Sequence, residues 1–343
     1  MKAIVAHQHA PGAVELREVP CPTPGPDEVL LRVGAAGVCG SDLHLWHCTH
    51  SFEVTYPRVL GHEFAGTVAA VGNAVTGFAP GDRVASETAA AICGTCALCR
   101  TGRYNVCPHR LGFGILRDGG MAEFVTVPAR ALHHLPDGLS LEDGAMIEPA
   151  CVGFQAAAVK ARVTPGDVVA VIGPGPIGLM ALQCARLFSP TDLVLIGLRQ
   201  DEARLQVGLK VGATRVIRSD EEDPLPVLRA LGDGLGPDVI FDAVGISSTL
   251  RLAVEAVRPD GQIVKIGWGP DPVDFSLDPL VQKAARIQAS FSHTWEVWER
   301  VIRLVAAGQL SLAPLREVFR LEDWEACFER MDSLAIAKAV LVP

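Results

Sequence analysis

One segment, residues 168–188, limits the folds available to this chain more than any other. It reads "VVAVIGPGPIGLMALQCARLF", in which an apolar run turns through three glycines into a helix-like stretch. An apolar run without alternation indicates a strand buried on both faces. Glycines in Gly-x-Gly-x-x-Gly spacing permit a tight turn and let a pyrophosphate approach the backbone. The segment therefore predicts a dinucleotide-binding turn, made of Gly173, Gly175, Pro176, Ile177 and Gly178.

The alternation of strands and helices continues to about residue 267. Further apolar runs read "DLVLIGL", "RVIRS", "DVIFDAVG" and "GQIVKIG", and helix-like stretches such as "STLRLAVEAV" separate them. Buried strands that alternate with helices are typical of a doubly wound parallel sheet. We therefore expect an α/β coenzyme domain over residues 153–292.

The first part of the chain has a different sequence pattern. Up to about residue 150, short strands such as "KAIVAH", "EVLLRVGAAGV" and "AEFVTVP" are separated by turns that contain Gly and Pro. This punctuation is typical of an irregular, barrel-like β domain. The tail carries an amphipathic "TWEVWERVIRLVAAG" and a closing "KAVLVP" strand. We expect residues 293–343 to return to a first domain formed by residues 1–152.

Four cysteines cluster in "ICGTCALCRTGRYNVC". Their spacing, with small residues between them, is typical of a tetrahedral zinc site. An iron–sulfur site is the nearest alternative, but its bacterial pattern closes with a shorter last interval than this one. Because four thiolates leave no position for water or substrate, the cluster predicts a structural zinc site. Its ligands would be Cys93, Cys96, Cys99 and Cys107.

A second, open metal site is predicted from two other stretches. "GVCGSDLH" provides Cys39, and "PRVLGHEFAG" provides His62 and Glu63. Each stretch alone is weak evidence, because single Cys and His residues usually serve packing or the surface. Together they offer the mixed ligand set that leaves zinc a position for water. "GAMIEPACVG" adds Glu148, either a second carboxylate at this metal or a structural residue paired with Arg110 or Arg117.

Composition narrows the class of partner. A net charge of −9 argues against nucleic acid, whose binding needs a basic surface. The apolar stretches are broken by Gly and Pro before they reach the roughly 20 residues of a membrane-spanning helix. Ten cysteines in 343 residues are too few for a disulfide scaffold, and "MKAIVAHQHAPG" does not read as a secretion signal. We expect a cytoplasmic protein with a small-molecule substrate.

Taken together, these motifs resemble the zinc-dependent medium-chain dehydrogenases/reductases, and most closely the sorbitol (L-iditol) and threonine dehydrogenase branch. The likeness runs through "GVCGSDLH", "YPRVLGHEFAGTVAAVG", the cysteine loop, "GGMAEFVTVPA", "IEPACVG", "GPGPIG" and "KAVLVP". It implies a GroES-like catalytic domain, a Rossmann coenzyme domain and an active site in the cleft between them. It also implies two zinc ions per chain, NAD or NADP, and a homodimer or homotetramer.

The resemblance assigns roles to single residues. Cys39, His62 and Glu63 would hold the catalytic zinc, with Glu148 as a direct or water-mediated alternative to Glu63. Ser41 and His44 match positions that handle the proton of the substrate, although a short polar side chain also serves a turn. The other histidines and the cysteine of "HLWHCTH" are interpreted as a lip of the cleft: His47, Cys48 and His50.

The coenzyme position departs from the usual pattern. Folds that prefer NAD place an acidic residue about 20 residues after the glycines to bind the adenosine ribose. Here "LVLIGLRQDEARL" puts Gly197 near that position and Arg199 two residues later. A guanidinium without a competing carboxylate favours the 2′-phosphate of NADP. Asp201 lies close enough in sequence that a small shift of the turn would bring it to the acidic position and restore a preference for NAD. The sequence therefore predicts only a slight preference for NADP.

We therefore expect a zinc-dependent dehydrogenase that oxidises a secondary alcohol of a polyol or sugar-like substrate to a ketone. An L-threonine 3-dehydrogenase on the same frame is the first alternative. A nucleotide-binding structural protein without turnover is the second, and the open metal site argues against it. The run "RIQASFSHT" predicts a last strand with an exposed edge, so we expect dimers joined near residues 289–292.

Overall fold

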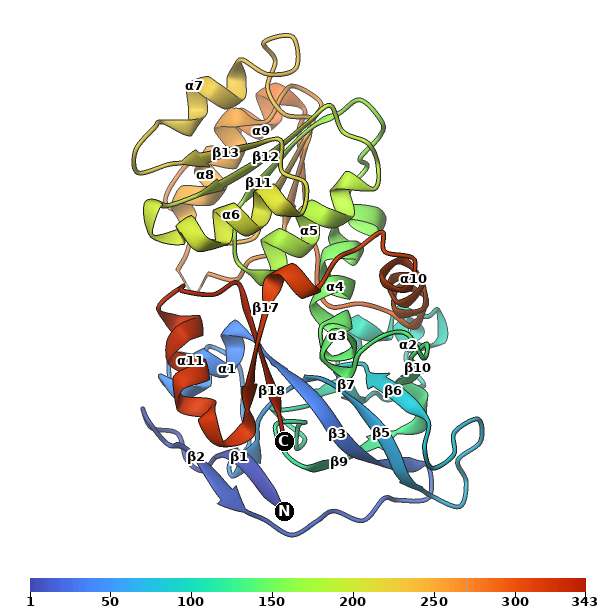
Figure 1. The fold of residues 1–343 in the computed structure, drawn as a ribbon. Helices are drawn as coiled ribbons and strands as arrows, with labels where there is room; N and C mark the ends of the chain where they lie inside the picture. The colour runs from blue at the N-terminus through green and yellow to red at the C-terminus, as the bar shows by residue number, and fades with distance from the viewer. Residues whose placement is uncertain (270) are drawn as a thin grey trace. The chain divides into compact units, whose positions relative to one another are not determined.

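The computed structural model describes residues 1–269 and 271–343. Contacts divide the chain into two units (Figure 1). The first unit contains residues 1–148, 293–308 and 316–343, and the second contains residues 149–292 and 309–315. Within the described residues, no helix has the length and apolar character needed to cross a membrane.

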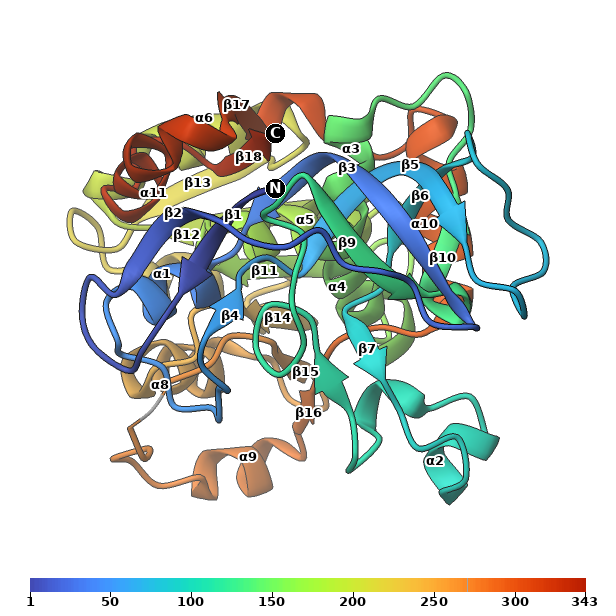
Figure 2. The same cartoon turned by 90° about the horizontal axis from the view of Figure 1, so that it is seen from below.

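The first unit is built on an irregular seven-stranded sheet, with strand order β10-β6-β5-β3-β18-β17 and β9 paired to β3 (Figure 2). Its strands are β3 (Glu28–Val38), β5 (Glu63–Val71), β6 (Arg83–Ser86), β9 (Phe124–Pro128), β10 (Leu132–His134), β17 (Arg316–Arg320) and β18 (Lys338–Val342). A three-stranded sheet holds β2 (Val14–Glu18), β1 (Lys2–Ala6) and β4 (Arg58–Val59), and a two-stranded one holds β7 (Ala89–Ala91) and β8 (Leu111–Gly112).

Helices complete this unit. They are α1 (Gly40–Trp46), α2 (Ala97–Arg100), α3 (Leu141–Ala145), α10 (Trp295–Ala306) and α11 (Trp324–Asp332), with the start of α4 (Ile147–Phe154). Alternate residues of β3, including Val29, Leu31 and Val33, are buried in a core with Phe64 and Phe328. Burial of such side chains contributes roughly 1.5–3 kcal/mol each and fixes which face of each strand points inward.

The register of three neighbouring strands determines where the residues of the predicted open metal site meet. β3 pairs antiparallel with β5, with Gly37 opposite Glu63. β3 also pairs with β18, with Val38 opposite Ala339. The end of β3, the start of β5 and the start of β18 therefore meet at one edge of the sheet.

The second unit is a six-stranded, all-parallel sheet with order β13-β12-β11-β14-β15-β16. The strands are β11 (Val168–Ile172), β12 (Asp192–Gly197), β13 (Arg215–Arg218), β14 (Val239–Asp242), β15 (Gln262–Lys265) and β16 (Arg286–Ala289). The helices are α5 (Pro176–Arg186), α6 (Glu202–Lys210), α7 (Pro224–Arg229), α8 (Ser247–Ala256) and α9 (Asp278–Lys283). α5 and α6 cover one face of the sheet, and α8 and α9 cover the other (Figures 1 and 2).

This strand order has a topological switch at β11, because the chain moves to one side through β12 and to the other through β14. Ligands of doubly wound sheets bind beyond the carboxyl ends of the strands at such a switch. The glycine turn follows β11 directly, at that point. The predicted fold class, a β domain combined with a doubly wound parallel sheet, is confirmed.

Candidate functional site

The four cysteines of the loop around α2 gather as the spacing predicts. Their sulfur atoms all lie within 4.8 Å of one another. Cys93 Sγ lies 3.9 Å from Cys99 Sγ and 3.6 Å from Cys107 Sγ. A tetrahedral zinc site with Zn–S bonds of about 2.3 Å separates its sulfurs by about 3.8 Å. The residues present therefore fit a closed four-thiolate zinc shell.

Charge in this loop supports the same interpretation. Hydrogen bonds from the backbone N–H groups of Cys96 and Thr95 lower the pKa of Cys93 to about 5, so this thiol is ionised at neutral pH. Desolvation and hydrogen bonds with Cys96 and Cys107 raise the pKa of Cys99 to about 12. Four sulfurs at this spacing cannot all carry charge without a cation among them.

The open metal site is assembled by the strand register described above. Cys39 follows β3 and is the N-cap residue of α1, while Glu63 begins β5 directly after His62. One ligand atom of each of these three residues lies within 4.8 Å of the other two. Gly37 faces the carboxylate, and a Cβ there would lie 2.2 Å from Glu63 Oε2, so glycine is needed to seat that side chain. Sequence positions 39, 62 and 63 are thus brought together by the fold.

Negative charge surrounds the imidazole of this triad. Burial disfavours the charged form of His62, but Cys39, Asp42 and Glu148 outweigh burial and raise its pKa to about 10. Asp42 is itself buried, and its Oδ2 accepts a hydrogen bond from Cys39 N at 2.8 Å. Such an excess of acidic groups around one histidine is the environment that a bound dication neutralises.

Glu63 has a partner that sequence reasoning missed. Lys338 Nζ lies 2.5 Å from Glu63 Oε2, and both side chains are only 1% exposed. Lys338 also donates to Val38 O at 2.8 Å. The second oxygen, Glu63 Oε1, is buried and has no hydrogen-bond partner among the described residues. A carboxylate with unfilled acceptor sites beside Cys39 and His62 fits a metal ligand. The signal in the sequence was a lysine at the head of the otherwise apolar run "KAVLV".

Glu148 is held by a second residue that the sequence did not reveal. His293 Nε2 lies 3.0 Å from Glu148 Oε1, and Trp298 Nε1 donates to His293 Nδ1 at 2.7 Å. Because an indole N–H can only donate, Nδ1 carries no proton and Nε2–H points at the carboxylate. Burial raises the pKa of Glu148, but His293 outweighs it and the net shift is downward. Of the two arginines considered as partners of Glu148, Arg117 pairs with Glu28 at 2.9 Å instead, whereas the charge of Glu148 partly offsets the lowering of the Arg110 pKa by burial.

Ser41 and His44 lie on α1, the helix that Cys39 caps. Ser41 is half-buried and His44 is exposed. His44 Nδ1 lies 2.9 Å from Thr49 Oγ1, which leaves Nε2 as the nitrogen that can take or release a proton. Both residues therefore share a short rigid element with the predicted metal ligand.

In the second unit, each of the three glycines of the turn after β11 is needed for a different physical reason. Gly173 has φ +98°, a conformation that favours glycine, and a Cβ on Gly178 would lie 1.9 Å from Gly173 O. These two glycines are required by the fold itself. Gly175 has φ −65°, and a Cβ there would meet nothing within 4 Å. No close contact within the described chain requires glycine here, although glycine is also favoured over alanine at an N-cap. A pyrophosphate that approaches the N-terminus of α5 would require it.

The turn after β12 holds the predicted ribose-recognition residues. A Cβ on Gly197 would lie 2.8 Å from Pro174, so its lack of a side chain is explained by packing. Asp201 is turned into its own loop, where Oδ2 accepts from Leu198 N at 2.9 Å. The side chain of Arg199 is 78% exposed, and its Nη1 lies 3.2 Å from Glu221 Oε1.

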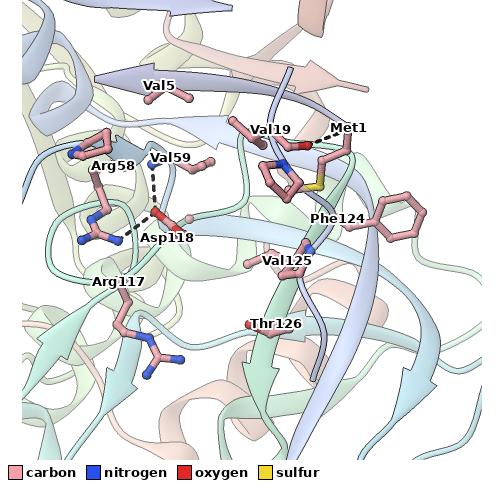
Figure 3. Close-up of a pocket in the computed structure, with 14 residues that line it drawn as sticks. Met1, Val5, Val19, Arg58, Val59, Arg117, Asp118, Phe124, Val125 and Thr126 are labelled. Atoms are coloured by element: carbon pink, nitrogen blue, oxygen red, sulfur yellow. Dashed lines mark hydrogen bonds and ion pairs between the residues drawn. The ribbon is translucent and has the colours of Figure 1, made fainter. Parts of the chain in front are cut away.

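A pocket on the first unit lies apart from these groups (Figure 3). Its charged lining is already paired, because Arg58 Nη1 lies 2.8 Å from Asp118 Oδ1 and Arg117 pairs with Glu28. None of the predicted metal ligands or glycines lines it. We assign this pocket no part in the chemistry.

Comparisons with known proteins agree with this geometry. Residues 25–137 match the alcohol dehydrogenase GroES-like domain, and residues 176–307 match the zinc-binding dehydrogenase family. A sorbitol dehydrogenase of Halalkalibacterium halodurans is 36% identical over 345 residues, covering 100% of this chain and 99% of the relative. An L-threonine 3-dehydrogenase of Bacillus velezensis is 33% identical, covering 100% and 99%.

Among solved structures, the galactitol-1-phosphate dehydrogenase of Escherichia coli superposes with a TM-score of 0.89 at 30% identity, over 100% of both chains. Identity and coverage at this level define a family and not only a fold. The chain belongs to the zinc-dependent medium-chain dehydrogenases/reductases, in the branch of the sorbitol and threonine dehydrogenases. The predicted resemblance is confirmed.

The glycine turn gives a prediction that separates binding from folding. Gly175→Ala should lower the free energy of unfolding by no more than about 1 kcal/mol, because the new methyl group meets nothing and only the N-cap preference for glycine over alanine is lost. It should weaken NAD(P) binding by about tenfold or more, because the methyl group occupies the approach of the pyrophosphate. Gly178→Ala should instead destabilise the protein by about 1–3 kcal/mol, because its methyl group overlaps a backbone oxygen.

Chemical denaturation and coenzyme titration on both variants make the measurement. An unfolding penalty for Gly175→Ala as large as that for Gly178→Ala, or unchanged coenzyme affinity, would contradict the ligand explanation of this glycine.

Proposed function

We propose that this protein oxidises a secondary alcohol of a polyol or sugar-like substrate to a ketone, with transfer of hydride to NAD or NADP. One observation carries the proposal. A thiol, an imidazole and a carboxylate lie within 4.8 Å of one another in the first unit, which is the three-ligand set of a zinc site with an open position. A dehydrogenase needs such a position for its substrate, whereas a structural zinc does not.

In this proposal Cys39, His62 and Glu63 hold the catalytic zinc, and the cysteine loop holds a structural one. When bound, zinc supplies Lewis acidity that lowers the pKa of an alcohol, and the nicotinamide accepts hydride. Lys338 orients the Glu63 carboxylate through Oε2, which leaves Oε1 for the metal. Asp42 fixes the backbone of Cys39 in the same way, through its hydrogen bond to Cys39 N.

In this proposal, residues on α1 transfer the proton of the substrate hydroxyl to water. We assign Ser41 the contact with the substrate hydroxyl and His44 Nε2 the exchange of the proton with water. Thr49 Oγ1 on Nδ1 keeps the His44 ring in one orientation. Glu148 is proposed as a second carboxylate near the metal that assists when substrate arrives, held in place by His293.

The polyol class rests on the oxygen-rich ligand set and on relatives that act on sorbitol and galactitol 1-phosphate. The alternative is L-threonine as substrate, which the 33% identical threonine dehydrogenase favours. Both substrates carry a secondary alcohol beside a polar neighbour, so the same residues would serve either one. All ten cysteines are free thiols, and zinc thiolates persist in a reducing compartment, for which we propose the cytoplasm.

Coenzyme reduction with a panel of polyols, polyol phosphates and L-threonine tests the function. We expect turnover with at least one polyol, and about two zinc ions per chain. Cys39→Ser should keep the fold and the loop zinc but lose turnover by roughly 100-fold or more, because an open zinc site depends on each of its ligands.

Cys21→Ser is the matched control, because Cys21 is exposed and belongs to neither predicted metal site. Full activity in Cys39→Ser would overturn the assignment of the catalytic metal. Turnover with threonine alone would replace the polyol by the amino acid.

For the coenzyme we propose a slight preference for NADP. The position where NAD-preferring folds carry an acidic residue holds Gly197, and the Asp201 carboxylate is engaged by its own loop. Arg199 is exposed and free to reorient, since its ion pair with Glu221 is a surface contact. Surface pairs of this kind contribute only about 0–1 kcal/mol, so a 2′-phosphate can displace Glu221.

Arg199→Ala should therefore weaken NADP binding by about 1.5–3 kcal/mol, the usual contribution of a hydrogen bond to a charged group, and leave NAD nearly unchanged. Glu221→Gln should act in the opposite direction and tighten NADP binding, because it removes the competitor. Titration of both coenzymes against each variant provides the measurement. Equal effects of Arg199→Ala on NAD and NADP would show that the guanidinium does not recognise the phosphate.

For assembly we propose a homodimer, or a tetramer built from such dimers, joined through β16. This strand is the last of its sheet and pairs only with β15 among the described residues. Its neighbourhood carries exposed apolar side chains, among them Ile287 and Phe291 at 39% exposure each. An open strand edge with apolar flanks is a template for pairing with a second copy.

Sedimentation should find at least a dimer at micromolar concentration. Ile287→Lys together with Phe291→Lys should shift the protein towards the monomer, because charges at an edge oppose strand pairing. The exposed Val318→Lys on β17 is a control that should leave the assembly unchanged. A monomeric parent protein would rule this assembly out.

A further inference from the structure

A third group of metal-binding side chains lies outside both zinc sites. His9 belongs to the turn between β1 and β2, while Cys48 and His50 follow α1. One ring nitrogen of each histidine and the sulfur of Cys48 lie within 4.8 Å of one another. Two members belong to the "HLWHCTH" run, but the third comes from 39 residues earlier in the chain. The proposed dehydrogenase chemistry uses none of them.

The distances suit a metal ion of the zinc class. Cys48 Sγ lies 3.5 Å from His9 Nδ1, and the rings of His9 and His50 lie nearly perpendicular with centroids 5.1 Å apart. In a tetrahedral zinc site a sulfur and a nitrogen ligand are about 3.5 Å apart, from bond lengths of about 2.3 and 2.0–2.1 Å. A thiol–imidazole hydrogen bond would account for Cys48 and His9, but it leaves the second imidazole unexplained.

The hydrogen bonding of the His50 ring supports a metal site independently of the distances between the ligands. Nε2 lies 3.2 Å from Tyr56 Oη, whereas Nδ1 is buried and has no hydrogen-bond partner among the described residues. A metal-binding histidine commonly holds one nitrogen in a hydrogen bond and gives the other to the metal. Burial is the largest cause of a lowered pKa at His50, and it outweighs the opposing effect of the His44 backbone.

We propose that His9, Cys48 and His50 form a third site, which binds Zn²⁺ through one thiolate and two imidazoles with Tyr56 supporting His50. His9 is exposed and the other two ligands are half-buried, so water can complete the coordination and the ion can exchange with solvent. The site is separate from the proposed catalytic metal, and its existence does not depend on the substrate or on turnover.

Protection of Cys48 from alkylation tests this site in the unmodified full-length protein. After dialysis against a weak chelator, the protein is treated with iodoacetamide with and without added Zn²⁺, and each cysteine is quantified by peptide mapping. Because the thiolate is the nucleophile and the metal ligand, Zn²⁺ should slow alkylation of Cys48 by about tenfold or more. The exposed Cys21 should react at the same rate in both conditions, and Mg²⁺, which prefers oxygen ligands, should give no protection.

Variants assign the ligands. His9→Gln and His50→Gln should each abolish the protection by Zn²⁺, whereas His47→Gln, next to Cys48 but paired with Asp332 at 3.2 Å, should keep it. Thermal unfolding of each variant without added zinc should match the parent, which separates loss of a ligand from loss of the fold. Cys48 alkylation that is unaffected by Zn²⁺, or protection that survives both His9→Gln and His50→Gln, would overturn the proposal.

Discussion

The candidate catalytic site depends on one buried ion pair, between Lys338 and Glu63. Both side chains are 1% exposed, so both charges have lost nearly all contact with water. Removing one partner of such a pair typically costs about 3–5 kcal/mol, because the other charge stays buried without compensation. The register of β18, β3 and β5 brings the two groups together, because β3 pairs with both of the strands that carry them.

Around this pair, the polar groups are arranged in a way that limits their movement. Asp42 fixes the backbone of Cys39, and Gly37 leaves the space that the Glu63 carboxylate occupies. Trp298 sets the tautomer of His293, which in turn holds Glu148. Ligand groups whose orientation is fixed by a second layer need little reorganisation when a metal or a substrate binds.

The two predicted zinc sites differ in how far they depend on the tertiary fold. Local spacing and backbone N–H groups aim the four thiols of the cysteine loop at one point, so that site needs little of the remaining fold. The open set draws its ligands from the ends of two strands, so it depends on the pairing of those strands. The His9, Cys48 and His50 cluster resembles the open set, because a turn 39 residues away supplies one of its ligands.

The sequence by itself determined those features that depend on residues close together in the chain. The glycine turn, the alternation of strands and helices, and the cysteine spacing are local patterns, and they predicted the fold class and the residues of the loop site. Sequence also named Cys39, His62 and Glu63, because motifs of this family keep them close to recognisable turns. Only the tertiary structure supplied Lys338 and His293, since burial of a charge and pairing across 145 residues follow from strand register and packing. Those contacts have no local periodicity, so no window of sequence contains the physical cause that brings them together.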